Sequence, residues 1–433
     1  GGLPLGVHRG MARPCLVDPP AMNTKRKSAL QTVATRLVLV GVGALLALVL
    51  AEAALTVAGI APARRPGRSW GLRNEAYGWG YLPGATFTYD GRFEKFGAPG
   101  RINSKGLRER EYSYDKPAGV FRVLVLGDSF TASLEVPLEQ TWHEVLEAEL
   151  NKAQSSSRHV EVIAAGIQGW STDQQYLYYL HEGYKYHPDL VLVQFYPNDI
   201  YGNGLEVQKL TRVMTETDKP FFVLSDDRRL VLTDPFRTER QAQTEVRATG
   251  PVGLVKDVLR SRLRTYRLVT QVRQARTGSR RPRVPFCYDY DGVPPELLTY
   301  APQFSPEYKA AWDVTARVLE ELRNETARRG QRLAVLHMPD RRQVLPREWQ
   351  RTLECWPAAA RLSWDLDKPN HLLGDLLNQH ATPYLDLTEP FRQAANAGRS
   401  IYFETDWHLN PDGHRFVGSM LADWLRSESL LPR

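Results

Sequence analysis

The stretch Val123-Leu124-Val125-Leu126-Gly127-Asp128-Ser129-Phe130 decides the fold. Its four consecutive apolar residues are typical of a short strand that is buried on both faces, as in a parallel sheet. Gly127 allows a sharp turn, because glycine adopts backbone angles that other residues cannot. We therefore expect Ser129 just beyond the carboxyl end of this strand, at the edge where open α/β sheets bind their ligands.

Two interpretations of Ser129 follow from this position. A serine at the start of the next helix is placed as a nucleophile, and nearby backbone N–H groups are available to the oxyanion that forms. A capping serine on a solvated turn would have the same local sequence. The remaining loops of the chain therefore have to distinguish the two.

Further apolar segments alternate with helical patterns along the chain. They cover residues 160–165, 190–195, 332–338 and 384–387, after a first strand that begins at Val120. This alternation predicts a doubly wound, three-layer α/β/α fold around a five-stranded parallel sheet.

Residues 201–305 interrupt the alternation, and long insertions at this edge of a sheet commonly cover the substrate, so we expect a cap region there. The insertion contains an expected hairpin over residues 221–232, and an earlier hairpin is expected over residues 85–96, around Asp90-Gly91. The arginine-rich stretch 260–273 is typical of a solvated helix face, with an anionic polymer or lipid headgroups as the alternative partner.

Composition limits the classes of partner. The net charge of +7 over 433 residues favours acidic surfaces or anionic glycans, and it is too weak to indicate nucleic acid. The sequence has no zinc-type Cys/His cluster and no Walker loop, so neither a metal nor a cofactor is expected. Three scattered cysteines make no disulfide framework, and a Cys287–Cys355 pair stays an open question.

The amino-terminal part contains an apolar stretch over residues 37–60, which follows Lys25, Arg26 and Lys27. A basic flank before an apolar run indicates either a signal anchor or a cleavable signal peptide, and the length of this run favours the anchor. We therefore expect a membrane-anchored body outside the cytoplasm, in the periplasm or at the cell surface.

Three further loops carry polar groups suited to catalysis. They contain Gly169 after the second strand, Asn198 after the third, and the pair Asp406 and His408 before the last helix. Residues two apart in an extended loop point the same way, so Asp406 is expected to orient the His408 ring. Asn410-Pro411 marks the start of the last helix.

Other histidines are assigned lesser roles. His337 ends the fourth strand and is the second choice for a catalytic base. His414 is expected to be structural inside the last helix, and His143 is expected at the surface, because it lies off the apolar stripe of its helix.

The ordered blocks Gly127-Asp128-Ser129-Phe130, Gly166-Ile167-Gln168-Gly169, Pro197-Asn198-Asp199 and Asp406-Trp407-His408 resemble those of the SGNH/GDSL hydrolase superfamily. The resemblance implies that Ser129 is the nucleophile, His408 the base and Asp406 its partner. It also implies an oxyanion hole of Ser129, Gly169 and Asn198. Many members have two residues between the last aspartate and histidine, whereas the single residue here is similar to alginate-type polysaccharide O-acetyltransferases.

The resemblance implies an extracytoplasmic serine esterase that hydrolyses carboxylic esters, with acetyl or short acyl groups, on an acylated glycan, a lipid or a small ester. One alternative is an O-acyltransferase that acts on a cell-surface or secreted polysaccharide, and another is a catalytically inactive glycan-binding module. We expect a leader at 1–36, a transmembrane anchor at 37–60 and a linker with a hairpin at 61–118. The hydrolase domain would then cover residues 119–433.

Overall fold

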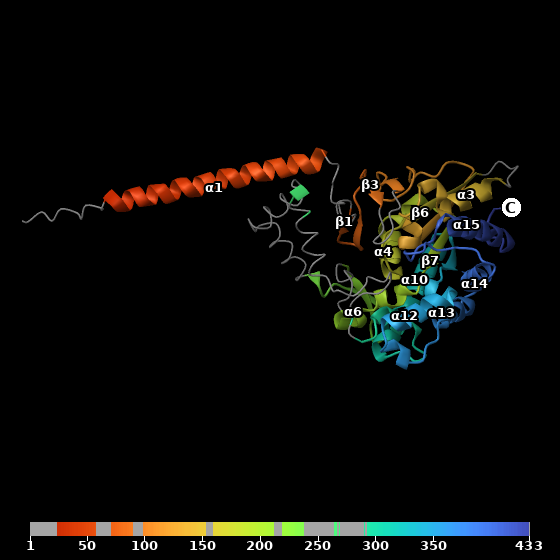
Figure 1. Cartoon of the computed structure of the whole chain (residues 1–433). Coiled ribbons are helices and arrows are strands. Elements are labelled where there is room, and N and C mark those ends of the chain that lie inside the picture. Colours follow the sequence, from red (N-terminus) through yellow and green to blue (C-terminus); the bar gives the residue numbers. More distant parts are fainter. Residues whose placement is uncertain are drawn as a thin grey trace, which may run out of the picture. The chain divides into compact units, whose positions relative to one another are not determined.

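The computed structural model describes residues 24–57, 71–89, 98–152, 159–211, 219–237, 264–265, 268, 290 and 292–432. The chain divides into two compact units (Figure 1), of which the first comprises residues 1–64 and 251–279 and the second residues 65–250 and 280–433. We describe each unit by itself.

The first unit contains a long helix, α1 (Thr24–Val57). Its segment Thr32–Leu55 has a mean hydropathy of 2.5 and is the only stretch among the described residues that is long and apolar enough to cross a membrane. Glu52 interrupts it near the end, and its carboxylate accepts hydrogen bonds from the backbone N–H groups of Arg264 (2.5 Å) and Thr265 (3.0 Å). Most of the arginine-rich stretch 260–273 lies outside the described residues.

The second unit is built on a five-stranded parallel sheet, as the sequence predicts. In spatial order its strands are β11 (Tyr384–Asp386), β10 (Arg332–His337), β7 (Leu190–Phe195), β5 (Val120–Gly127) and β6 (His159–Gly166). The chain runs from β5 to β6 on one side and then crosses to β7 on the other. The carboxyl end of β5 therefore lies at the point where the strand order reverses, and α/β sheets bind ligands at that point.

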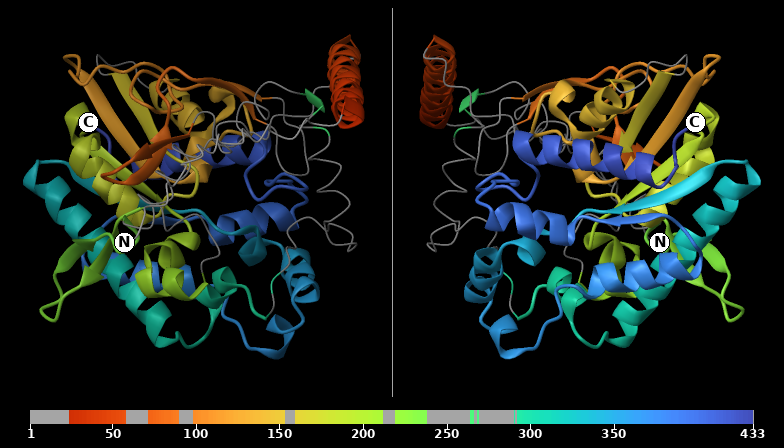
Figure 2. Two further views of the ribbon diagram at one scale, coloured as in Figure 1. Left: turned by 90° about the vertical axis from the view of Figure 1, so that its left-hand side faces the viewer. Right: turned by 90° about the vertical axis from the view of Figure 1, so that its right-hand side faces the viewer.

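Helices cover both faces of this sheet, so the fold has three layers (Figure 2). Val123 and Val125 of β5 pack on the layer of α3 (Trp142–Lys152), α14 (Thr388–Asn396) and α15 (Pro411–Ser427). Leu124 and Leu126 pack on the layer of α4 (Thr172–His181), α10 (Pro306–Arg328) and α13 (Lys368–Gln379). Alternate residues of a strand point to opposite faces, and both faces here are covered, which explains why residues 123–126 of β5 are all apolar.

The expected start of α15 is confirmed, and α4 also begins at a capping residue. Asn410 caps α15, with its side chain accepting the Gly413 N–H at 2.9 Å and Pro411 in the first helical position. Ser171 caps α4 in a reciprocal arrangement with Gln174, which satisfies two backbone donors that the helix itself leaves unpaired.

Three two-stranded antiparallel ribbons accompany the sheet. They are β1 (Gly71–Asn74) with β2 (Gly78–Tyr81), β3 (Thr86–Tyr89) with β4 (Ala98–Arg101), and β8 (Phe221–Leu224) with β9 (Leu230–Thr233). The last pair confirms the hairpin expected over residues 221–232.

The hairpin expected over residues 85–96 is wrong in its second strand. Tyr89 pairs with Ala98, so the second strand begins at residue 98, and the Asp90-Gly91 turn lies outside the described residues. The partner strand contains Gly100, and the Phe87 ring fills the space where a Cβ would stand. An aromatic ring that covers a cross-strand glycine stabilises this pairing.

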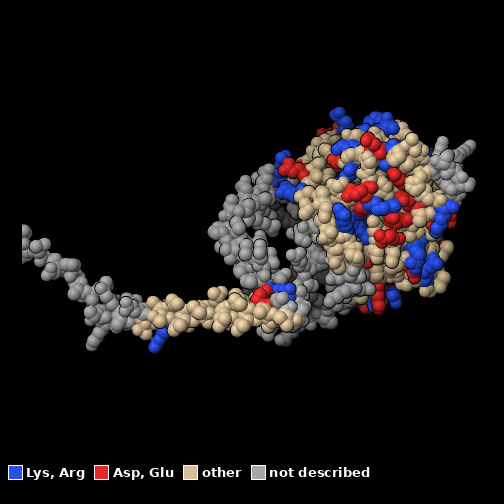
Figure 3. Space-filling view, turned by 90° about the horizontal axis from the view of Figure 1, so that it is seen from above, with Lys and Arg blue, Asp and Glu red and all other residues tan. Residues whose placement is uncertain are grey.

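Short elements complete the second unit. The α-helices are α2 (Ser129–Ala132), α5 (Asn198–Asn203), α6 (Leu205–Thr211), α11 (Arg341–Val344) and α12 (Pro346–Cys355). The 3₁₀ helices are η1 (Leu138–Gln140), η2 (Gly183–Tyr186), η4 (Pro295–Tyr300) and η5 (Ala359–Arg361). Figure 3 shows basic and acidic side chains interspersed on the visible face of this unit, so the net positive charge does not gather into one patch there.

Candidate active site

Ser129 is the first residue of α2, directly after β5. Asp128 caps this helix, and its carboxylate accepts the Phe130 N–H at 2.9 Å. Gly127 is required for packing, because a Cβ at this position would collide with Thr131 Oγ1. The Ser129 residue is partly exposed, and its hydroxyl has no hydrogen-bond partner among the described residues. Ser129, the nucleophile expected from the sequence, is therefore accessible to solvent at the edge of the sheet.

The loops that carry Gly169 and Asn198 lie on either side of Ser129. Gly169 has a φ of +73°, a left-handed conformation that favours glycine, in the loop after β6. That loop approaches α2 so closely that a Cβ on Gly166 would collide with the backbone N of Ala132. Asn198 begins α5 after β7, and its Nδ2 donates to Asp128 Oδ2 at 3.4 Å. Both predicted oxyanion residues thus follow strands adjacent to β5.

His408 lies in a tight loop between Tyr402 and Leu409, which form an antiparallel bridge. The Phe403 N–H donates to the His408 carbonyl at 3.0 Å and closes the loop. Asp406 Oδ1 lies 2.5 Å from His408 Nδ1 and accepts the His408 backbone N–H at 3.1 Å. The structure therefore places Asp406 where the alternation of the loop predicts it.

The His408 loop meets the nucleophile block through Phe130. The centroids of the Phe130 and His408 rings lie 5.0 Å apart. No hydrogen bond joins His408 to Ser129 among the described residues, although such bonds often form only when substrate is bound. Two residues far apart in the chain therefore lie at one edge of the sheet, with the imidazole beside the residue that follows the candidate nucleophile.

Acidic groups determine the charge of this site. Burial lowers the pKa of His408, but the carboxylates of Glu135 and Asp406 outweigh it and raise the pKa to about 10. Burial also raises the pKa of Asp406, and here the adjacent His408 outweighs it and holds the value below the usual range. Burial raises the pKa of the capping Asp128 to about 6. The site can therefore hold a protonated imidazole beside an ionised carboxylate.

The family model of the GDSL-like lipase/acylhydrolase family matches residues 125–416, which include all of these loops. The chain belongs to this family. Members are ester hydrolases, and the match confirms the resemblance drawn from the four sequence blocks. No curated protein sequence matches the chain.

Solved structures similar to this GDSL family member include several esterases. The acetyl xylan esterase AlAXEase is 12% identical, with a TM-score of 0.36, over 71% of this chain and 99% of the other. LAE5, an alpha/beta hydrolase enzyme from the metagenome of Lake Arreo, Spain, is 13% identical, with a TM-score of 0.37, over 72% and 97%. The psychrotrophic esterase EstA from Pseudoalteromonas sp. is 11% identical, with a TM-score of 0.34, over 72% and 99%.

Sequence reasoning missed Glu135. This residue lies in the irregular segment between α2 and η1, and its side chain is fully buried. Its Oε1 stands 3.0 Å from His408 Nδ1, the same nitrogen that contacts Asp406. No periodic pattern in the sequence indicates this placement, because the segment belongs to neither a helix nor a strand.

Sequence reasoning also missed Arg341, which stabilises the backbone of the loop that carries His408. Arg341 is buried, and its Nη1 donates to the carbonyl oxygens of Phe403 (3.0 Å) and Asp406 (2.7 Å). These bonds hold the backbone of the loop where its side chains reach the GDSL serine block. Arg341 begins the helix after β10, a position that by itself indicates no role.

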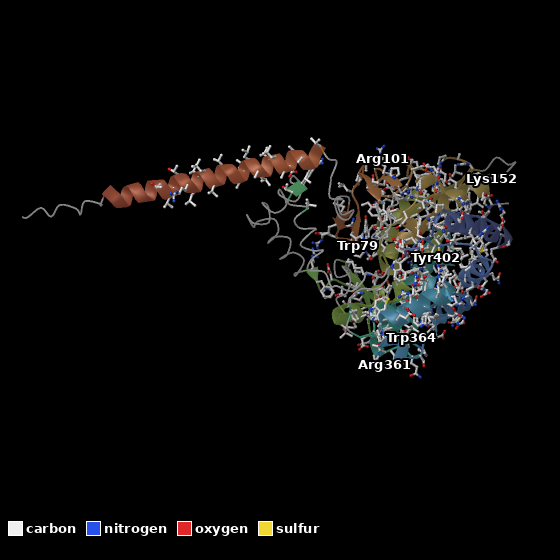
Figure 4. All side chains as sticks on the ribbon, in the orientation of Figure 1. Trp79, Arg101, Lys152, Arg361, Trp364 and Tyr402 are labelled. Carbon is white, nitrogen blue, oxygen red and sulfur yellow. The ribbon has the colours of Figure 1, made fainter. Side chains whose placement is uncertain are left out.

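The amino-terminal ribbons contact the glycine loop of this family member. Trp79 of β2, labelled in Figure 4, donates from Nε1 to the Gln168 carbonyl at 2.9 Å. The Gln168 N–H donates to the Tyr81 hydroxyl at 3.0 Å, and the Gln168 side chain donates to the Tyr89 hydroxyl at 3.2 Å. The ribbons therefore fix the loop that carries Gly169, a role that the expectation of a linker with a hairpin over residues 61–118 did not include.

The other histidines have partners of their own. His337 is buried, and a hydrogen bond of 3.0 Å between its Nδ1 and Asp386 Oδ1 joins the ends of β10 and β11. His414 is buried inside α15, and its Nδ1 accepts the Trp142 N–H at 3.2 Å, which agrees with the structural role expected for it.

The surface position expected for His143 is wrong. Its side chain is fully buried, with Nδ1 3.4 Å from Glu109 Oε2. The apolar stripe of α3 describes only the face toward the sheet, whereas His143 packs against the segment that carries Glu109.

Within the part of the chain that the structure describes, two groups of side chains offer atoms that could hold a metal ion, each with its atoms within 4.8 Å of one another. They are Glu109, His143 and Glu144, and Glu135, Asp406 and His408. In the first group the Arg110 guanidinium lies 3.1 Å from Glu144 and already supplies positive charge. In the second group both carboxylates contact His408 Nδ1, so the imidazole itself can supply the positive charge between them.

Proposed function

We propose that this GDSL family member is a serine esterase in which Ser129 is the nucleophile, His408 the general base and Asp406 the residue that orients the base. The observation that supports this assignment is the Asp406–His408 pair beside the nucleophile block, with the His408 ring 5.0 Å from the Phe130 ring. Acyl transfer by serine needs these groups together, because an unassisted hydroxyl is a weak nucleophile.

The reaction proceeds in two halves. His408 Nε2 takes the Ser129 proton as Oγ attacks the ester carbonyl carbon, and the pair Nδ1–Asp406 fixes the ring for this transfer. The carbon–oxygen bond to the alcohol then breaks, the imidazolium gives its proton to the departing alcohol, and an acyl-enzyme remains. Water repeats the sequence on the acyl-enzyme and releases the carboxylic acid and the free serine.

The developing negative charge of each tetrahedral intermediate needs donors. We assign the backbone N–H groups of Ser129 and Gly169 and the side-chain amide of Asn198 to this role, because all three follow adjacent strands at the same edge. The Asn198 amide contacts Asp128 at 3.4 Å in the absence of substrate, a weak bond that a substrate oxyanion can replace.

The proposed substrate is a carboxylic ester with an acetyl or short acyl group, on an acylated glycan, a lipid or a small alcohol. The Tyr196 ring packs against the Phe130 ring next to the nucleophile, with the two centroids 4.7 Å apart. This contact limits the space beside Ser129 and so supports a short acyl group. Neither a cofactor nor a metal enters this reaction.

We place the hydrolase domain, residues 119–433 with a cap at 201–305, outside the cytoplasm. In this arrangement residues 37–60 are the anchor, preceded by a cytoplasmic segment over 1–36 and followed by a linker with a hairpin over 61–118. The apolar segment Thr32–Leu55 supports the anchor. Cys355 is disulfide-bonded, and such bonds persist mainly in oxidising compartments outside the cytoplasm.

The test is hydrolysis of p-nitrophenyl esters of increasing acyl length by the full chain, purified in detergent. We expect turnover of the acetyl ester, and Ser129→Ala should lower kcat/KM by at least about 1,000-fold. Ser419→Ala, a change of the same size on the exposed face of α15, is the matched control and should retain full activity. Activity that survives Ser129→Ala would show that this serine is not the nucleophile.

A further inference from the structure

Two carboxylates, not one, contact the imidazole of the candidate base. Asp406 Oδ1 lies 2.5 Å and Glu135 Oε1 3.0 Å from the same atom, His408 Nδ1. A neutral or protonated imidazole carries at most one proton on this nitrogen, so the two acids share a single donor. The triad expected for the family accounts for Asp406 and leaves Glu135 without a role.

Apart from His408, little in the described structure stabilises the Glu135 carboxylate. Its side chain is fully buried, and apart from the contact with His408 neither carboxyl oxygen has a hydrogen-bond partner among the described residues. A buried carboxylate without such partners is costly, whereas an apolar residue of similar size would pack at no such cost. The placement therefore indicates that Glu135 interacts with the charge of His408.

We propose that Glu135 is a positioning residue that holds His408 through a second carboxylate contact at Nδ1 and favours the protonated form of the imidazole. The inference rests on the proposed function, in which His408 is the base. Glu135 acts through the histidine, since its buried carboxylate contacts Nδ1, whereas the proposed function uses Nε2 to take the Ser129 proton.

The surroundings of the pair agree with this direction. Negative charge from Glu135 and Asp406 favours the protonated imidazole and raises the pKa of His408 to about 10. Burial raises the pKa of the Glu135 carboxyl, and the charge of His408 opposes that effect. The other charged and titratable groups around the His408–Glu135 pair are Asp128, Arg108, Tyr81, Tyr89 and His414. Arg108 and His414 oppose the effect, but neither contacts His408, whereas Glu135 does.

The consequence is an esterase whose activity rises with pH into the alkaline range. Only the neutral imidazole accepts the serine proton, so kcat/KM increases as pH rises through the pKa of His408. Replacement of Glu135 by glutamine removes one negative charge, lowers that pKa and moves the acid limb of the profile to lower pH. An opposite charge at this distance typically shifts a pKa by about 1–3 pH units.

The first experiment measures kcat/KM against pH for the full chain and for Glu135→Gln, with spontaneous ester hydrolysis subtracted. We expect the acid limb of Glu135→Gln to move down by at least about one pH unit. Glu139→Gln, which changes an exposed acid of the following helix η1, is the matched control and should leave the limb in place. A folded Glu135→Gln enzyme whose limb coincides with that of the wild type would overturn the proposal.

A second readout needs no catalysis and so separates this inference from the proposed function. Diethyl pyrocarbonate modifies neutral imidazole, and mass spectrometry of the full-length Ser129→Ala chain follows its reaction at His408 against pH. We expect a midpoint well above 6.5, the ordinary pKa of histidine. A midpoint at about 6.5 would overturn the proposal even if Glu135→Gln does not fold, whereas absent ester hydrolysis with a high midpoint would count only against the proposed function.

Discussion

At the scale of single residues, two acids, Asp406 and Glu135, contact the same imidazole nitrogen of His408. Ser129, Asp406 and His408 lie in loops that follow or precede clear elements, so their type and place in the chain indicate their roles. Glu135 lies in an irregular segment after Ser133, whose positive φ of 49° turns the chain back toward the site. Such a turn has no periodic signature, and for this reason the second acid could not be predicted.

Asn198 allows the proposed oxyanion hole to be tested at one position. Asn198→Ala should lower kcat about 100- to 1,000-fold with little change in KM, because the lost donor contacts only the charge that develops in the transition state. Steady-state kinetics on the acetyl ester check this expectation.

The control for Asn198→Ala is Asn378→Ala, which removes an exposed amide at the end of α13 and should retain the full kcat. An Asn198→Ala enzyme with the wild-type kcat would remove this residue from the oxyanion hole.

At the scale of elements, the five sheet strands agree with the predicted segments to within about two residues, because buried parallel strands are continuous apolar runs. The predictions that proved wrong concern elements that contact segments without regular secondary structure. Tyr89 pairs with Ala98 rather than with a nearer residue, and His143 is buried by the segment that carries Glu109. Both depend on contacts between distant residues, which local spacing does not contain.

The start of α15 shows how an element supports the site. Asn410 caps this helix two residues after His408, and its amide also donates to the carbonyl oxygens of Ser400 and Tyr402 at 3.1 Å. Asn410→Ala should therefore lower the free energy of unfolding by about 1–2 kcal/mol. Chemical denaturation followed by tryptophan fluorescence measures this change.

Asn410→Asp retains the oxygen that accepts the Gly413 N–H but loses the amide that donates to the Ser400 and Tyr402 carbonyls, so it should recover only part of the loss. Equal stability of Asn410→Ala and the wild type would contradict the role of the cap.

At the scale of the whole molecule, the class of fold is predictable from the alternation of strands and helices, but the order of the strands is not. The order β6-β5-β7 brings the loops of Gly169, Ser129 and Asn198 side by side. The His408 loop, which directly precedes α15, reaches the same edge. The amino-terminal ribbons add contacts to the glycine loop that only the folded chain reveals. The site therefore depends on the order of the strands in the sheet as much as on the four sequence blocks.

The central claim is that His408 activates Ser129, and reaction with a fluorophosphonate probe tests it most directly. In the detergent-solubilised full chain, mass spectrometry should locate the phosphonyl group on Ser129, at a rate that rises with pH as His408 loses its proton. His408→Ala should slow this labelling by at least about 1,000-fold, because the hydroxyl then lacks its base. Labelling of Ser129 at the wild-type rate in His408→Ala, or labelling of a different residue in the wild type, would contradict the account.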